Sequence, residues 1–122
     1  MPPALRALRG AITVDEDEES HVHERVITLL ETLCARNGVD HDDIVSILFT
    51  ATDDLHATFP ATGARTMGLG DVPLICAQEI GVTGSMARVV RVMAHVECEL
   101  PRAQVTHVYL RGAEALRGDL PK

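Results

Sequence analysis

The sequence of 122 residues is poor in aromatic side chains. It has no tryptophan, and its only rings of this class are Phe49, Phe59 and Tyr109. Basic residues are outnumbered as well, because 11 Lys and Arg stand against 18 Asp and Glu and give a net charge of −7. Nucleic-acid binders usually need a basic surface, and single-strand binders also need rings on which bases stack. The composition therefore argues against a nucleic-acid partner, whereas a small anion is still possible, since one pocket can be positive on an acidic protein.

Cysteine is also scarce. Cys34, Cys76 and Cys98 are odd in number and lack CxxC spacing, so neither a disulfide framework nor a zinc knuckle is indicated. Reduced thiols are typical of cytoplasmic proteins. No apolar run approaches the roughly 18 residues of a membrane span, and the first residues lack the apolar core of a signal peptide. We expect a cytoplasmic protein without membrane contact.

Motifs for metal, phosphate or nucleophilic chemistry are missing. His21 and His23 are two residues apart on a predicted helix, so they do not face each other, and the nearby acids fit turns and helix starts. The glycines of "MGLGD" are not followed by Lys and Ser or Thr, and no GxSxG is present. We expect no metal and no cofactor.

What the sequence does contain is a regular succession of strands and helices. The pattern predicts a single domain, 1–122, of the α/β (α+β) class: a mixed β-sheet of about five strands with helices packed on it. The expected strands are 5–14, 44–52, 72–78, 88–98 and 105–110, and the expected helices are 15–38 and 60–67 with a helical turn at 113–116. The C-terminal segment, about 113–122, is expected to be mobile.

Two of the arginines in predicted strands are candidate ligand contacts, Arg9 in "LRALRGAITV" and Arg91 in "RVVRVMAHVE". A buried charge without a partner costs about 3–5 kcal/mol, so each needs water, an internal carboxylate or an anionic ligand. A strand-edge position or a surface salt bridge is the simpler interpretation of one such residue, and a bound anion is the alternative. Glu79 could be a plain ion-pair partner for Arg91, or it could accept a hydrogen bond from a ligand hydroxyl.

Two further residues are weaker candidates. Cys76 lies three residues before Glu79, and strict strand alternation would put the two on opposite faces unless the strand ends or bulges near Gln78. A buried inert thiol is the simpler interpretation. Tyr109 could donate from its phenol to a carboxylate while its ring packs on apolar surface, or it could simply pack.

Four separated blocks of sequence, in order, resemble one known family. These are "RALRGAITV", "ATDDLHATFPATGAR", "VPLICAQEIGVTGSMARVVRVM" and "HVYLRGAEALRGDL". Together they are similar to the monofunctional bacterial chorismate mutases of the trimeric α/β type. The resemblance runs in one register from about Leu5 to Leu120, with one small length difference near "TMGLGD".

The resemblance implies a pseudo-barrel homotrimer with active sites in clefts between subunits. It also implies the Claisen rearrangement of chorismate to prephenate, on the route to phenylalanine and tyrosine. Arg91 would donate to the ether oxygen of the breaking bond, and Glu79 would hold the ring hydroxyl. Arg9 and Tyr109 would bind substrate carboxylate, with Cys76 lining the same pocket.

Other roles implied by the resemblance are peripheral. Phe59 would supply an apolar wall from the neighbouring subunit and Arg65 would lie near the entrance, while Leu116 and Arg117 would belong to a C-terminal segment that closes over the ligand. Relatives can carry lysine where Thr62 stands and proline where Gly118 stands.

Two other functions are compatible with the pattern. Small trimeric enamine and imine deaminases of the Rid type have a similar architecture and an arginine at an intersubunit cleft. A non-catalytic domain could use the same arginines to hold an anion.

Overall fold

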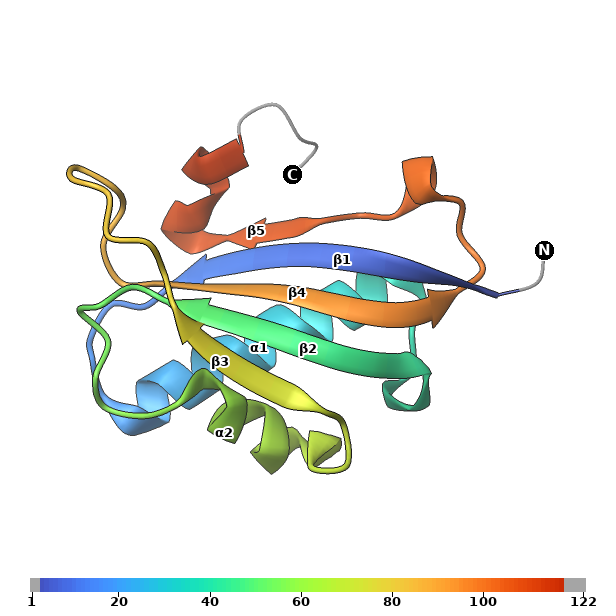
Figure 1. Ribbon diagram of the computed structural model, residues 1–122, viewed down its shortest axis with the longest axis horizontal. Coiled ribbons are helices and arrows are strands. Elements are labelled where there is room, and N and C mark those ends of the chain that lie inside the picture. The colour runs from blue at the N-terminus through green and yellow to red at the C-terminus, as the bar shows by residue number, and fades with distance from the viewer. Residues whose placement is uncertain (1–2, 118–122) are drawn as a thin grey trace.

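Strands and helices alternate as far as the third strand, and two further strands follow without an α-helix between them (Figure 1). The computed structural model describes residues 3–117. The strands are β1 (Ala4–Thr13), β2 (Ile44–Ala51), β3 (Leu74–Gln78), β4 (Val89–Cys98) and β5 (Val108–Leu110), and the helices are α1 (Glu19–Asn37) and α2 (Pro60–Ala64). A π-helical turn, Arg65–Leu69, extends α2, and a 3₁₀ turn, Arg111–Arg117, follows β5. The predicted order of elements is confirmed. Within the described part of the chain, no helix is long and apolar enough to cross a membrane.

The five strands form one mixed sheet in the order β3-β2-β4-β1-β5. β4 is antiparallel to both of its neighbours, β1 and β2, whereas β5 is parallel to β1 and β3 is parallel to β2. This confirms the predicted mixed sheet. β5 is shorter than the expected strand 105–110, because it pairs with β1 only over Gly10–Ile12.

Helix α1 buries one face, as its periodicity predicts. It ends where expected: Gly38 adopts the left-handed conformation, with φ of 62°, and its N–H donates to the carbonyl of Cys34. The face consists of side chains that are at most 1% exposed: Val22, Val26, Leu29, Leu30 and Leu33.

The start of α1 differs from the prediction by four residues. The carboxylate of Glu18 accepts from two backbone N–H groups of the first turn and caps the helix there. The acidic residues before it lie outside the helix. Asp15 accepts from Arg25 at 2.7 Å, and Asp17 accepts from two backbone N–H groups of the segment 52–59. The acidic residues at the predicted helix start therefore have different functions: Glu18 caps the helix, whereas Asp15 and Asp17 accept hydrogen bonds in the loop before it.

Both helices pack on the same face of the sheet (Figure 1). α1 contacts β1 and β5, α2 contacts β2 and β3, and the helices contact each other. Gly63 allows this approach, since a Cβ atom there would lie 3.2 Å from both the Cα of His23 and the Cβ of Val26. The largest fully buried side chains lie in this layer and include Leu8, Ile12, Leu29, Leu30, Ile47 and Phe49.

Neither α1 nor α2 covers the opposite face, which we call the open face. Strand alternation and register bring Leu5, Arg9, Leu48, Ile75 and Met93 to it. Leu5, Leu48 and Ile75 are 60%, 39% and 64% exposed. The two candidate arginines, Arg9 and Arg91, lie on this face.

Candidate active site

Arg91 lies near the middle of the sheet, on β4, opposite Ala11 of β1 and Thr50 of β2. It is therefore not an edge residue. Its side chain is 41% exposed, because the open face leaves water on one side of it. The full cost of a buried, unpaired charge does not arise.

Four predicted site residues meet in one cavity of about 200 Å³ on the open face. They come from β1, β4, β5 and the end of β3, which the sheet order brings together. We call this the arginine cavity; it is lined by Arg9, Gly10, Leu48, Thr50, Glu79, Arg91, Val92, Met93 and Tyr109.

Glu79 is held in this cavity by three contacts. Its Oε2 atom lies 2.8 Å from Nε of Arg91 and accepts a hydrogen bond from Thr50 Oγ1 at 2.9 Å. Its backbone N–H donates to the carbonyl of Ala51 at 2.8 Å. Glu79 directly follows the last residue of β3, Gln78, and strand alternation puts it on the same open face as Ile75. Both neighbours use the same carboxylate oxygen, Oε2.

The Nε–H group of Arg91 is buried and is not directed at any acceptor, although Oε2 of Glu79 is close. We interpret the contact as an ion pair without an aligned hydrogen bond. An unsatisfied buried donor costs free energy unless something else accepts from it. The charge of the Glu79 carboxylate offsets part of that cost, and the rest of the Arg91 side chain, which is 41% exposed, lines the arginine cavity.

The segment 52–59, which leads from β2 to α2, is fastened near the start of β4. The Asp54 carboxylate accepts from the backbone N–H of Arg88 at 2.9 Å and from Thr52 Oγ1 at 2.5 Å. The carboxylate of Asp17 accepts hydrogen bonds from the backbone N–H groups of Ala57 and His56. These bonds, the one from Ala57 most strongly, lower the pKa of Asp17 from its ordinary value of 3.8. The loop that carries Phe59 is therefore held at two points.

Phe59 and Cys76 do not lie in the arginine cavity of their own chain. They line a different cavity of about 520 Å³, together with Ala51, Thr52, Asp53, Leu55, His56, Thr58, Pro60, Ala77 and Gln78. Phe59 is 69% exposed there. We call this the phenylalanine cavity. Alternation explains the separation, since Cys76 and Glu79 are three residues apart and therefore fall on opposite faces, Cys76 being packed against the core.

The comparisons with known proteins agree over nearly the whole chain. The family model described as chorismate mutase type I matches residues 5–120. The AroH chorismate mutase of Thermus thermophilus is 43% identical over 95% of this chain and 96% of its own length, and that of Bacillus subtilis is 41% identical over 95% and 92%. A solved chorismate mutase from Clostridium thermocellum superposes with a TM-score of 0.87 at 42% identity, covering 89% of this chain and 97% of its own.

The chain belongs to the type I chorismate mutase family. The family and fold predicted from the four sequence blocks are thereby confirmed, and so is the predicted chorismate mutase activity, an isomerase activity. None of these findings favours a Rid-type deaminase or a non-catalytic domain.

The structure describes one of the two positions, Thr62 and Gly118, at which the resemblance implied a departure from relatives. Thr62 is on α2, and its hydroxyl lies 3.5 Å from Nη1 of Arg65, an exposed residue in the next turn. A threonine here adds no charge beside Arg65, where a lysine would. Gly118 lies outside the described residues.

The C-terminal turn packs against the sheet next to Tyr109, and the described residues of the turn are not among those that line the arginine cavity. Ala113 is fully buried and forms a small apolar cluster with Ala11 and Val89, against which Tyr109 and Leu116 pack. Arg117 ends the turn Arg111–Arg117, but its side chain lies outside what the structure describes. The remainder of the predicted mobile segment, 118–122, also lies outside the described residues.

Thr50 is the site residue that sequence reasoning missed. Its signal was weak, because a single threonine in "SILFTAT" fits a strand by propensity alone. Only the register of β2 against β4 shows that its hydroxyl lies beside the Glu79–Arg91 pair. Among residues 3–117, no three His, Cys, Asp or Glu side chains are grouped so as to hold a metal ion.

Proposed function

We propose that the arginine cavity binds chorismate and promotes its rearrangement to prephenate. The observation that carries this is the Arg91–Glu79 ion pair, in a cavity that also contains Arg9 and Tyr109. A dianion with an ether oxygen and a ring hydroxyl needs cationic donors and one acceptor, and this set supplies both.

The reaction is unimolecular, so the protein must do two things. It must select the compact conformer in which the reacting carbons meet, which is a task of orientation. It must also stabilise the negative charge that develops on the ether oxygen as the C–O bond breaks. In the same step the new C–C bond forms and the electron pairs shift around a six-membered ring. No proton is transferred.

We assign the second task to Arg91 and the hydroxyl contact to Oε1 of Glu79. A millionfold acceleration requires about 8 kcal/mol, and one well-placed donor to a developing oxyanion supplies about 2.7–4 kcal/mol. Arg91 therefore provides a large share but not all of the effect. Arg9 and Tyr109 would bind substrate carboxylate in ground and transition states alike, so they should act mainly on binding.

We propose that the active site is completed by a second subunit in a homotrimer. Small-molecule sites usually have volumes of about 300–1,000 Å³, whereas the arginine cavity has about 200 Å³ in one chain. Phe59 and Cys76 line a separate cavity of the same chain, which a neighbour could present across an interface. The exposed Leu48 and Ile75 give the open face an apolar surface that association would bury.

The remaining proposals, on the site entrance, the C-terminal segment and the location of the protein, are those that the family resemblance implies. Arg65 would lie near the entrance, and Leu116 and Arg117 would close over the ligand as part of a mobile segment, about 113–122, of a single domain 1–122. We propose a cytoplasmic location, to which the free thiols of Cys34, Cys76 and Cys98 are suited. We propose neither a nucleic-acid partner nor a membrane partner.

The decisive experiment is a continuous assay of chorismate loss with purified protein, with acid conversion of the product to phenylpyruvate as confirmation. Saturable loss is expected. Unchanged chorismate absorbance over hours would refute the proposal, and consumption of an imino acid instead would favour a deaminase. Sedimentation equilibrium tests the assembly separately: the expected mass is three times 13.2 kDa, and the mass of one chain would remove the intersubunit site.

A further inference from the structure

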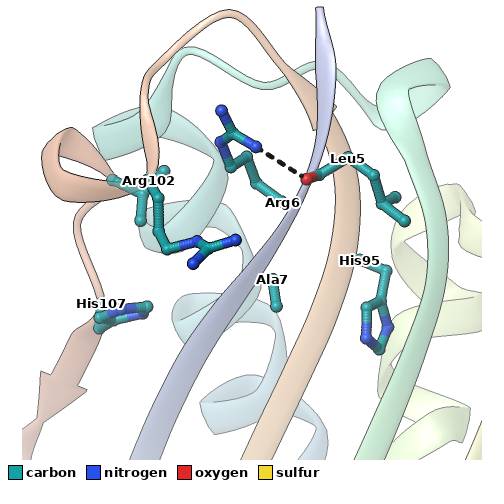
Figure 2. Close-up of a pocket in the computed structure, with 7 residues that line it drawn as sticks. Leu5, Arg6, Ala7, His95, Arg102 and His107 are labelled. Carbon is teal, nitrogen blue, oxygen red and sulfur yellow. Dashed lines mark hydrogen bonds between the residues drawn. The ribbon is translucent and has the colours of Figure 1, made fainter.

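A cavity of about 340 Å³ lies beside the N-terminal half of β1, away from the arginine cavity. It forms because β5 pairs with β1 only from Gly10 onward, so the segment 101–107 stands apart from the strand. Figure 2 shows its walls, which are Leu5, Arg6, Ala7, His95, Arg102, Val105 and His107. The two cavities have no lining residue in common.

Charge is segregated in this cavity, which we call the β1-edge cavity. Four of its lining residues are basic, namely Arg6, His95, Arg102 and His107, and none of the described residues that line it is acidic. The whole protein has 18 acidic and 11 basic Lys and Arg residues, so this local excess runs against the composition. The nearest acid in the register is Glu97, opposite Leu5 on β4, and it does not line the cavity.

Arg6 is held in place by the backbone. Its Nε donates to the carbonyl of Leu100 at 3.0 Å and its Nη1 to the carbonyl of Leu5 at 3.2 Å. Neither acceptor carries a net charge, and no carboxylate among residues 3–117 forms an ion pair with Arg6. A guanidinium fixed by neutral acceptors loses little side-chain entropy when it binds an anion.

Arg102 is exposed, in the short turn Arg102–Gln104, and makes no ion pair or hydrogen bond with the described residues. Its guanidinium points into the β1-edge cavity, between His107 and Arg6 (Figure 2). His107 Nδ1 accepts the backbone N–H of Arg9 at 3.0 Å, so the neutral ring carries its hydrogen on Nε2. The ring is therefore fixed as a donor on its other side.

We propose that the β1-edge cavity is a second anion-binding site, for the carboxylate or phosphate group of a small metabolite. Two guanidinium groups from opposite walls supply charge-assisted hydrogen bonds, which planar oxyanions accept well. The volume fits a small molecule and is larger than that of the arginine cavity in one chain. This site is independent of the proposed function, because its test measures binding and not turnover.

The test is a titration of the assembled protein with inorganic phosphate, malonate or chloride at constant ionic strength, with the His95 and His107 ring signals followed by NMR. We expect saturable shifts of both signals with phosphate, malonate or both, and none with chloride. The anion that acts identifies the chemistry of the ligand group.

The variant Arg102→Gln should weaken about tenfold the affinity of the β1-edge cavity for the anion that binds, since a hydrogen bond to a charged group contributes about 1.4 kcal/mol or more. Arg36→Gln, which removes an exposed charge at the end of α1, is the matched control and should bind like the wild type. Absence of saturable shifts in the wild type overturns the proposal. So does an Arg102→Gln protein that binds with unchanged affinity.

Discussion

The two faces of the sheet differ in what their side chains do, although the same strands build both. In β1, Leu8 is 1% exposed and lies under α1, whereas Arg9, the next residue, lines the arginine cavity. In β2, Ile47 is buried and Leu48 is 39% exposed. The covered face contributes stability through apolar packing, and the open face contributes charge, a cavity and an unpartnered apolar surface. Neighbouring residues of one strand therefore have different functions: one packs in the core and the next lines the candidate site.

The largest expected effect is on the free energy of unfolding. It is measured by making the same leucine-to-alanine substitution on the covered face and on the open face. Leu8→Ala should lower the free energy of unfolding by about 2–5 kcal/mol, because it leaves a cavity under α1. Leu48→Ala should lower it by less than half as much and should shift the assembly equilibrium instead. Urea unfolding and sedimentation at matched protein concentrations measure the two effects. Equal losses of stability would erase the distinction between the faces.

The next largest expected effect is on turnover, when the positive charge of Arg91 on the open face is removed. Arg91→Ala should lower turnover about 10²–10³-fold, which corresponds to about 2.7–4 kcal/mol of lost transition-state stabilisation. Arg91→Lys should also perform badly, since an ammonium group cannot reproduce the planar fork. Circular dichroism checks folding, and Arg36→Ala serves as the control. A folded Arg91→Ala protein with near-normal turnover would falsify the assignment.

A polar contact on the covered side should affect stability alone. Nδ2 of Asn37 donates to the carbonyls of Leu33 and Thr106 at 2.8 Å, and its Oδ1 accepts from Thr106 N–H at 2.7 Å. Asn37→Ala leaves these groups unpaired at a buried position and should cost about 1–3 kcal/mol of unfolding free energy. Thermal unfolding measures the loss. The value of kcat should stay within twofold, and a larger change would show that the helix side reaches the site.

Thr50 offers a smaller and sharper test on the open face. Thr50→Val keeps the shape but removes the donor to Glu79, so kcat/KM should fall roughly tenfold, the value of about 1.5 kcal/mol for a hydrogen bond to a charged group. Thr50→Ser retains the hydroxyl and should recover most of the activity. The melting temperature should change little in either variant. If valine and serine behave alike, the hydroxyl does not position the carboxylate.

The smallest expected effect is on the acid stability of the loop before α1, where Asp17 binds the segment 52–59. The pKa of Asp17 is lowered, so its contribution to stability is complete above its ordinary value of 3.8 and is lost as pH falls through the lower value in the folded state. Asp17→Asn should therefore flatten the acid limb of a plot of melting temperature against pH and leave the region above pH 6 parallel to the wild type. An unchanged acid limb would exclude Asp17 as its source.

Much of the fold was predictable from local pattern. The apolar face of α1 and the glycine at its end follow from periodicity and from the left-handed conformation that Gly38 adopts. The length of β5 was overestimated because the sequence pattern continues past the point where β1 is available for pairing. The start of α1 was placed too early because acids fit a capping loop as well as a first turn.

The candidate site was predicted in part. Arg9, Glu79, Arg91 and Tyr109 were named from the sequence, and the structure brings them to one cavity. Thr50 was missed, because its function depends on the partner that the register gives it. Cys76 was grouped with them by family resemblance, yet in one chain it lines the phenylalanine cavity.

The sequence by itself determined which segments are strands and helices, which residues are strand-borne cations, and which family the chain belongs to. Propensity and periodicity act between near neighbours in the chain, so they can be read there. Only the tertiary structure decided that β4 lies between β1 and β2, that one sheet face stays open, and that Arg91 meets Glu79 and Thr50 on it. These are long-range pairings, set by which surfaces pack together once all strands are present.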